Sequence, residues 1–252
     1  MSADPKILQS SSVNISASGE ASPRSAPRAT SRGNSALGTS ADHRTEQIAH
    51  EEYVKLVQRV FLRATGDAPQ VVVFSGIDPG NGCSRICRKA AEILAGASSG
   101  TVCLVDANLY SPPSRQDERN GLGLMESLVG NGPVRTYVHE METQNLWMLP
   151  RGCAGSASAN PIAIEMIRTR LQELRQEFDR VLIDAPPLNQ HSDAVALAQL
   201  ADGLIIVIEA DVTRRETARK VMETLSQAGV KVLGAVLNKR MFPIPEKLYR
   251  QL

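Results

Sequence analysis

The chain has 252 residues, a net charge of +1 and 42% hydrophobic residues, which suits a globular protein with one sizeable α/β domain. No basic stripe with interleaved aromatics occurs, so we expect no nucleic-acid partner. The first residues lack the basic and apolar regions of a signal peptide. Apolar runs such as Leu204–Ile208 are too short to span a bilayer, so we expect a cytoplasmic protein without a transmembrane segment of its own.

The first 45 residues differ in composition from the rest of the chain. Eleven of the first forty are serine, and no aromatic residue occurs before Tyr53. Such a segment cannot bury enough apolar surface to offset the entropy of ordering it, so we expect a disordered tail over residues 1–45. A folded domain is expected over residues 46–240, and a short C-terminal tail over residues 241–252.

From residue 46 onward, segments with helical spacing alternate with short apolar runs typical of buried strands. A first helix ends at Phe61, and later helices are expected near residues 85–97, 122–129, 161–178, 192–200 and 213–228. Strands are expected at Val71–Phe74, Val102–Val105, Leu146–Leu149, Val181–Ile183, Leu204–Ile208 and Val232–Leu237. This alternation predicts a doubly wound, mainly parallel α/β sheet with helices on both faces, whose ligand lies beyond the carboxyl ends of the strands.

A glycine-rich turn, Pro79-Gly80-Asn81-Gly82-Cys83-Ser84, follows the first of these strands and opens the next helix. Glycines let the backbone approach a phosphate group, and the N–H groups at the helix N-terminus favour an anion. This is the layout of a P-loop, with Ser84 where the hydroxyl ligates Mg²⁺, but Cys83 stands where the phosphate-binding lysine is expected. A dinucleotide-binding turn fails, because Arg85 occupies its third glycine position. Taken alone, the turn fits an ordinary strand-to-helix connection equally well.

Two aspartates each end an apolar strand. Asp106 follows Val105, and Asp184 follows Ile183. A carboxylate at the end of a buried strand can hold Mg²⁺ or its waters, as a Walker-B-type aspartate does. Each aspartate alone is more often a cap or turn residue. Two of them in this order beside one phosphate-type turn favour a nucleotide site.

With these motifs the chain resembles the cytoplasmic domain of the bacterial tyrosine autokinases that serve polysaccharide export, within the MinD/ParA-like group of P-loop proteins. Other matching stretches between about residues 47 and 240 include Leu104–Leu109, Leu149–Gly152, Asn160-Pro161, Asp179–Pro187, Thr213–Arg215 and Leu233–Asn238. The resemblance implies that the turn from Pro79 to Ser84 binds the phosphates of ATP. It further implies that Asn238 lies near the adenine, and that Mg²⁺ is organised by Ser84, Asp106 and Asp184.

The chain departs from this family pattern at several positions. Cys83 replaces the lysine, and Asn108 and Tyr110 replace the second aspartate and the arginine of an Asp-x-Asp-x-Arg motif. A helix motif for oligomerisation, Glu-x-x-Arg-x-x-Arg, reads Glu52-x-x-Lys55-x-x-Gln58. The C-terminal tail holds one tyrosine, Tyr249, as phosphoacceptor where the family has a cluster.

These losses bear on catalysis more than on binding. A lost charge-assisted hydrogen bond costs about 1.5–3 kcal/mol of binding. A lost donor to the transition state costs about 10²–10³ in rate, and lost base assistance costs about 10²–10⁴. We therefore expect weak nucleotide binding without brisk kinase turnover, and we assign no catalytic residue.

Three functions follow as hypotheses. The best supported chemically is a catalytically impaired, tyrosine-autokinase-like domain that regulates exopolysaccharide or capsule synthesis or export. The alternatives are a residually active protein-tyrosine autokinase and a MinD/ParA-like nucleotide switch. The resemblance implies ATP and Mg²⁺ as cofactors, held weakly or lost. It implies a membrane-embedded polysaccharide co-polymerase or an active kinase paralogue as partner, which would place the chain at the inner membrane, and it leaves a homo-oligomer open.

Overall fold

The computed structural model describes residues 13–15, 38–62, 68–110, 121–152 and 164–240. At its centre is an eight-stranded sheet with the order β1-β8-β7-β2-β6-β3-β5-β4. All neighbouring strands are parallel except β4, which runs antiparallel to β5. The strands are β1 Val13–Ile15, β2 Val71–Gly76, β3 Val102–Asp106, β4 His139–Glu140, β5 Leu146–Leu149, β6 Arg180–Asp184, β7 Gly203–Glu209 and β8 Val232–Asn238.

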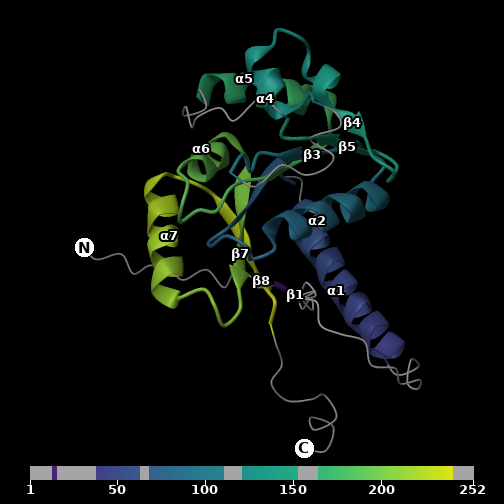
Figure 1. Cartoon of the computed structure of the whole chain (residues 1–252), viewed down its shortest axis with the longest axis vertical. Coiled ribbons are helices and arrows are strands. Elements are labelled where there is room, and N and C mark those ends of the chain that lie inside the picture. The colour runs from purple at the N-terminus through teal and green to yellow at the C-terminus, as the bar shows by residue number, and fades with distance from the viewer. Residues whose placement is uncertain (1–12, 16–37, 63–67, 111–120, 153–163, 241–252) are drawn as a thin grey trace, which may run out of the picture.

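Helices cover both faces of this sheet (Figure 1). They are α1 Gly38–Phe61, α2 Cys83–Ala97, α4 Leu124–Val129, α5 Ile164–Glu177, α6 Asp193–Leu200 and α7 Arg215–Gln227, with a 3₁₀ turn, η1, over Val134–Tyr137. Side chains alternate between the two faces, so Val71 and Val73 of β2 pack with the layer of α4 to α7, and Val72 and Phe74 pack with α1 and α2. The predicted doubly wound, mainly parallel sheet is confirmed.

The structure contains every strand and helix that the sequence pattern predicts, and it adds β1 and β4. These two strands have three and two residues, too few to carry an apolar pattern. Both β1 and the start of α1 lie within residues 1–45, so the structure differs there from the expected disordered tail. The first turns of α1 lack apolar spacing, and they extend a helix that is stabilised by its packed C-terminal half. The other residues of the predicted tails, including Tyr249, lie outside the described residues.

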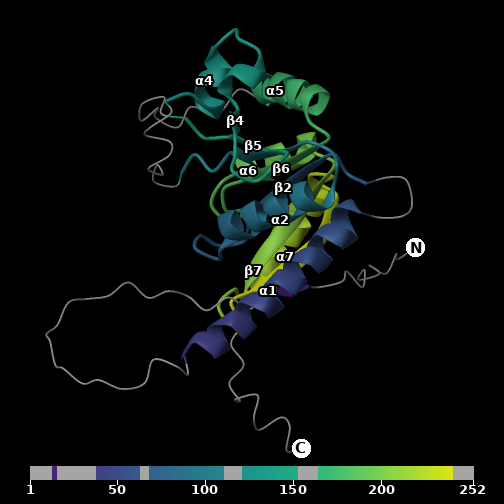
Figure 2. The same ribbon diagram turned by 90° about the vertical axis from the view of Figure 1, so that its right-hand side faces the viewer.

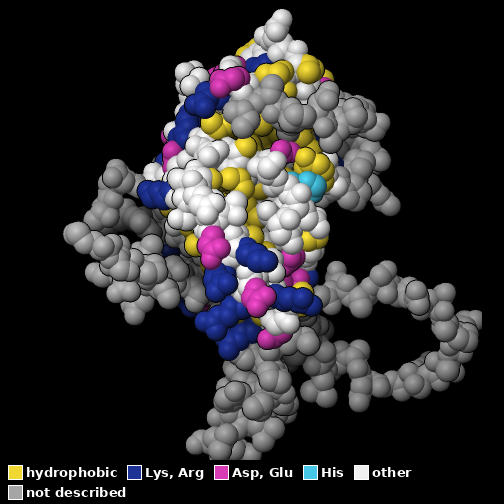
Figure 3. Space-filling view, turned by 90° about the vertical axis from the view of Figure 1, so that its left-hand side faces the viewer, with side chains coloured by type: hydrophobic (Ala, Val, Ile, Leu, Met, Phe, Trp, Pro, Cys, Tyr) yellow, Lys and Arg dark blue, Asp and Glu magenta, His cyan; other side chains and the backbone are white. Residues whose placement is uncertain are grey.

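The outer surfaces of the molecule differ in character. Helix α1 packs along α2 through Tyr53, Leu56, Val57, Val60 and Phe61, and its N-terminal end extends beyond the sheet (Figures 1 and 2). On the face that carries α7, basic and acidic side chains are intermixed (Figure 3). No helix in the described part of the chain is both long and apolar enough to cross a membrane.

Candidate functional site

The glycine-rich turn connects the end of β2 to the start of α2, at the edge of the sheet where the parallel strands end. Gly80 and Gly82 have φ angles of 78° and 85°, in the left-handed region that favours glycine. A Cβ atom on Gly82 would lie 2.5 Å from Nδ2 of Asn238. The turn therefore requires glycine at position 82 for its conformation and for the close approach of Asn238.

Two buried asparagines hold the turn from behind. Nδ2 of Asn81 donates to the carbonyl oxygen of Val207 at 2.9 Å, and its Oδ1 accepts from the backbone nitrogen of Cys83 at 3.2 Å. Nδ2 of Asn238 donates to the carbonyl oxygen of Asn81 at 2.7 Å. The ends of β7 and β8 thus fix the turn without any lysine at position 83.

Further side chains hold the same turn, and the sequence interpretation missed them. Nζ of Lys239 donates to the carbonyl oxygen of Gly80 at 2.6 Å and lies 3.2 Å from Oε2 of Glu209. Oδ2 of Asp78 accepts from Oγ1 of Thr213 at 3.1 Å. The position of Lys239 directly after Asn238 was the available signal for the first contact, and the matched stretch that begins at Thr213 was the signal for the second.

The structure places Ser84, Asp106 and Asp184 beside one another. Asp106 and Asp184 are register partners on β3 and β6. Asp184 is 6% exposed, and its Oδ1 atom has no hydrogen-bond partner among the described residues. Burial raises the pKa of Asp184 to about 7; the charge of Asp106 adds to this rise, while hydrogen bonds from Ser84 and Cys83 oppose it. A hydroxyl beside a buried carboxylate with an open oxygen suits Mg²⁺, which prefers oxygen ligands.

Asn108 adds another buried oxygen at this edge. Its backbone nitrogen donates to Oδ1 of Asp106 at 3.1 Å, and its carbonyl oxygen accepts from Nη1 of Arg151 at 3.2 Å. The side-chain Oδ1 of Asn108 is buried and has no partner within the part of the chain that is described. An amide at this position can ligate a cation or accept a hydrogen bond, but it cannot take up a proton as a carboxylate does.

Cys83 lies in the apolar layer between the sheet and α2 and is 9% exposed. Burial raises the pKa of its thiol well above the usual value, and the charge of Asp184 raises it further. The thiol is therefore neutral at physiological pH. It provides neither a cation for phosphate nor a reactive thiolate.

A cavity of about 480 Å³ opens in front of the turn. Besides the turn itself, its lining includes Asn108, Tyr110 and His191. The rings of Tyr110 and His191 stack with centroids 3.5 Å apart, and the Tyr110 hydroxyl donates to Oδ2 of Asp193 at 2.6 Å. This hydrogen bond is the main cause that raises the pKa of Tyr110 to about 12. The structure thus makes His191 part of the cavity wall.

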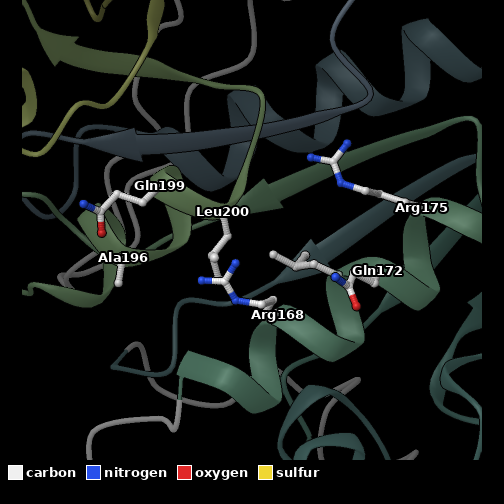
Figure 4. Close-up of a pocket in the computed structure, with 7 residues that line it drawn as sticks. Arg168, Gln172, Arg175, Ala196, Gln199 and Leu200 are labelled. Carbon is white, nitrogen blue, oxygen red and sulfur yellow. The ribbon is translucent and has the colours of Figure 1, made fainter.

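A second cavity of about 480 Å³ lies between α5 and α6 (Figure 4). Its lining includes Arg168, Gln172, Arg175 and Gln199, but no glycine turn and no strand-end aspartate. Arg175 is engaged with Asp202, to which its Nη1 and Nη2 atoms donate at 3.0 and 2.7 Å. The cavity at the glycine-rich turn is therefore the candidate site.

Comparison with known proteins gives this geometry a family context. No protein-family model matches the chain. Over 195 residues it is 29% identical to the tyrosine-protein kinase CpsD of Streptococcus agalactiae serotype III, an alignment that covers 75% of this chain and 82% of that kinase. Its homologues include bacterial tyrosine kinases. Over 179 residues it is also 29% identical to the succinoglycan biosynthesis transport protein ExoP of Rhizobium meliloti, covering 69% of this chain and 23% of ExoP.

Solved structures agree with the tyrosine-kinase assignment. The kinase domain of VpsO superposes with a TM-score of 0.66 at 26% identity, covering 80% of this chain and 99% of that domain. The cell-division protein MinD of Aquifex aeolicus superposes with a TM-score of 0.56 at 19% identity, covering 72% of each chain, and shows the shared fold alone. The resemblance to bacterial tyrosine kinases is confirmed, and so is the fold shared with MinD. Position 83 of this chain is a cysteine, where the P-loop layout predicts a lysine.

Proposed function

We propose that the chain is a tyrosine-kinase-like domain that regulates exopolysaccharide or capsule synthesis or export through weak nucleotide binding and partner contacts. In this proposal its phosphoryl transfer is impaired. One observation carries it: a fully anchored phosphate turn that has a buried, neutral thiol, Cys83, in place of the lysine. The anchored turn supports binding, and the thiol argues against transfer.

Nucleotide binding is supported by what the site retains. The backbone N–H groups at the start of α2 are free to donate to an anion, as such groups do in other phosphate turns. Asn238 keeps a buried Oδ1 without a partner in the described chain, and such an acceptor suits the exocyclic amine of adenine. Ser84, Asp106 and Asp184 would hold Mg²⁺. When bound, the ion neutralises phosphate charge.

Impaired transfer follows from the groups that are missing. Phosphoryl transfer depends almost wholly on positioning and on charge aimed at the transferred group. Without a cation at position 83, the rate falls by about 10²–10³. Because the Asn108 amide cannot accept the proton of an attacking hydroxyl, a further factor of about 10²–10⁴ is lost.

The role in polysaccharide synthesis rests on the relatives and their names. CpsD is named a tyrosine-protein kinase, and ExoP is named a succinoglycan biosynthesis transport protein. A membrane-embedded polysaccharide co-polymerase, or an active kinase paralogue, is the partner that this kinship favours. Such a partner would hold the domain at the inner membrane from the cytoplasmic side. A nucleotide switch outside polysaccharide work has only the MinD-like fold in its support.

A nucleotide titration of the wild type beside Cys83→Lys and Cys83→Ala tests the proposal. We expect weak binding of ATP with Mg²⁺ to the wild type and to Cys83→Ala. Affinity should rise by about 10- to 100-fold in Cys83→Lys, because a charge-assisted hydrogen bond is restored. An unchanged affinity in a folded Cys83→Lys variant would show that the turn is no phosphate site. Efficient phosphorylation of Tyr249 by the wild type would refute the impaired transfer.

A further inference from the structure

The cavity at the phosphate turn contains an arginine that the proposed function does not use. Arg85 is the third residue of α2, is exposed to solvent and lines this cavity. Its guanidinium makes no hydrogen bond or salt bridge in the described part of the chain. The molecule therefore presents an uncompensated positive charge two residues beyond the position of the missing lysine.

The position of this charge lowers the stability of α2 when no anion is bound. Cations near a helix N-terminus oppose the helix dipole, and the first turn of α2 contains no acidic residue that would balance Arg85. A bound anion would reverse the sign of this interaction, because it attracts both the helix N-terminus and the guanidinium. A residue that breaks a local charge rule beside a candidate site points to a ligand of the opposite charge.

The other basic side chain at the turn is already neutralised. Lys239 donates to the carbonyl oxygen of Gly80 and pairs with Glu209 at 3.2 Å, so it holds the turn. The charge of Arg85 also lowers the pKa of Tyr53, against a larger rise caused by burial. Arg85 therefore lines the cavity and is near enough to Tyr53 of α1 to act on it electrostatically.

We propose that Arg85 provides the positive charge for a bound polyphosphate that Cys83 cannot provide. The inference rests on the nucleotide binding proposed above and names its ligand class as polyphosphates, of which nucleoside di- and triphosphates are the members that the proposed function favours. A guanidinium can donate to two phosphate oxygens at once, which suits retention of a polyphosphate. Because it extends from the third residue of α2 and not from the lysine position at its first residue, this charge supports binding without restoring the transfer reaction.

The test is a set of titrations on the full chain with four probes: ATP with Mg²⁺, ADP with Mg²⁺, adenosine and inorganic tripolyphosphate. In Arg85→Ala we expect affinity for ATP, ADP and tripolyphosphate to fall about tenfold or more, with adenosine unchanged. Arg85→Lys should recover part of the loss. Arg168→Ala is the matched control, because it removes an exposed arginine from a cavity of the same volume (Figure 4) and should change nothing.

A second background sharpens the test. In Cys83→Lys, the restored lysine also neutralises phosphate charge. Arg85→Ala should therefore lower the affinity for ATP less in that background than in the wild type. Equal losses for ATP and adenosine would mean that Arg85 acts through the packing of Tyr53 and α1, and would overturn the inference. Unchanged ATP and tripolyphosphate affinities in Arg85→Ala would overturn it as well.

The outcomes also separate this inference from the proposed function. If the folded wild type binds tripolyphosphate through Arg85 but not ATP or ADP, the inference holds and the nucleotide assignment fails. If the wild type binds ATP, and Arg85→Ala binds it equally well, the nucleotide assignment holds and the inference fails. If the wild type binds neither ATP nor tripolyphosphate at millimolar concentration, the inference and the nucleotide assignment are both refuted.

Discussion

Two aspartates at opposite ends of the parallel strands show how the same side chain can support a fold or a site. Asp202 lies just before β7 and accepts hydrogen bonds from the backbone nitrogens of Gln70 and Val71, each at 2.8 Å, and from both Nη atoms of Arg175. Asp184 ends β6 and keeps a buried oxygen without a partner in the described chain. The first carboxylate is satisfied by the protein, and the second is open to a ligand.

The pKa values of the two carboxyls differ in direction for this reason. Burial alone would raise the pKa of Asp202, but hydrogen bonds from Arg175 and Val71 outweigh it and lower the pKa. Burial dominates at Asp184 and raises its pKa to about 7. A buried carboxylate with one oxygen left without a partner costs stability, and such a cost is typical of functional sites. The end of the sheet that carries Asp184 is therefore the candidate functional one.

The largest expected effect is a stabilisation by Asp184→Asn in the absence of metal. Because the folded-state pKa is raised, the wild type loses stability as pH rises from about 4 to about 7, and the loss is complete above pH 7. The amide removes this charge, so the free energy of unfolding at pH 8 should rise by on the order of 3 kcal/mol. Urea denaturation in a chelator at pH 4 and pH 8 measures the gain, which should vanish at pH 4.

The same variant tests the ligand role of this carboxylate. If Asp184 helps to hold Mg²⁺, added Mg²⁺ with nucleotide should raise the melting temperature of the wild type but not of Asp184→Asn. A variant that is less stable than the wild type at pH 8 without metal would show that Asp184 is a structural residue like Asp202.

The matched substitution at the other end of the strands, Asp202→Asn, should change the free energy of unfolding in the opposite direction. Asp202→Asn removes the charge that accepts from Arg175, so the free energy of unfolding should fall by about 1–2 kcal/mol at pH 7; partial exposure and solvent screening limit the loss. The pKa of Asp202 is lower in the folded state than in the unfolded state. Asp202 therefore contributes stability that is fully present above pH 4 and is lost as pH falls below 4 through the folded-state pKa. Urea denaturation at pH 7 and pH 3 would show it, and a loss equal at both pH values would contradict the explanation.

Most of the fold was predictable because the central strands are continuously apolar and the helices carry clear amphipathic spacing. The pattern could not reveal β1 and β4, since strands of three and two residues pair through backbone groups that every residue has. The start of α1 at Gly38 was missed for a related reason: Ala41 is the single apolar residue in its first two turns, and one residue does not mark a helix face.

The candidate site was predictable in its backbone and less so in its side-chain contacts. Glycine spacing and strand-end aspartates located the turn and the carboxylates. The stack of Tyr110 on His191 joins residues 81 positions apart, and the bond from Lys239 to Gly80 spans 159 positions. Contacts between distant loops depend on where the sheet brings strand ends together, which single-residue patterns do not encode.

The smallest expected effect comes from comparing a glycine of the turn with a glycine of the helix that follows it. Gly82→Ala places a side chain at a φ angle of 85° and against Asn238, so the free energy of unfolding should fall by about 1 kcal/mol and nucleotide affinity should fall with it. Gly96 lies within α2, and an added Cβ atom there would have open space around it. Gly96→Ala should therefore raise the free energy of unfolding by about 0.5–1 kcal/mol. Thermal unfolding with and without ATP compares the pair. If Gly82→Ala binds nucleotide as well as Gly96→Ala does, the left-handed turn held by Asn238 is not the phosphate site, and the contrast between the two ends of the strands would then rest on Asp184 alone.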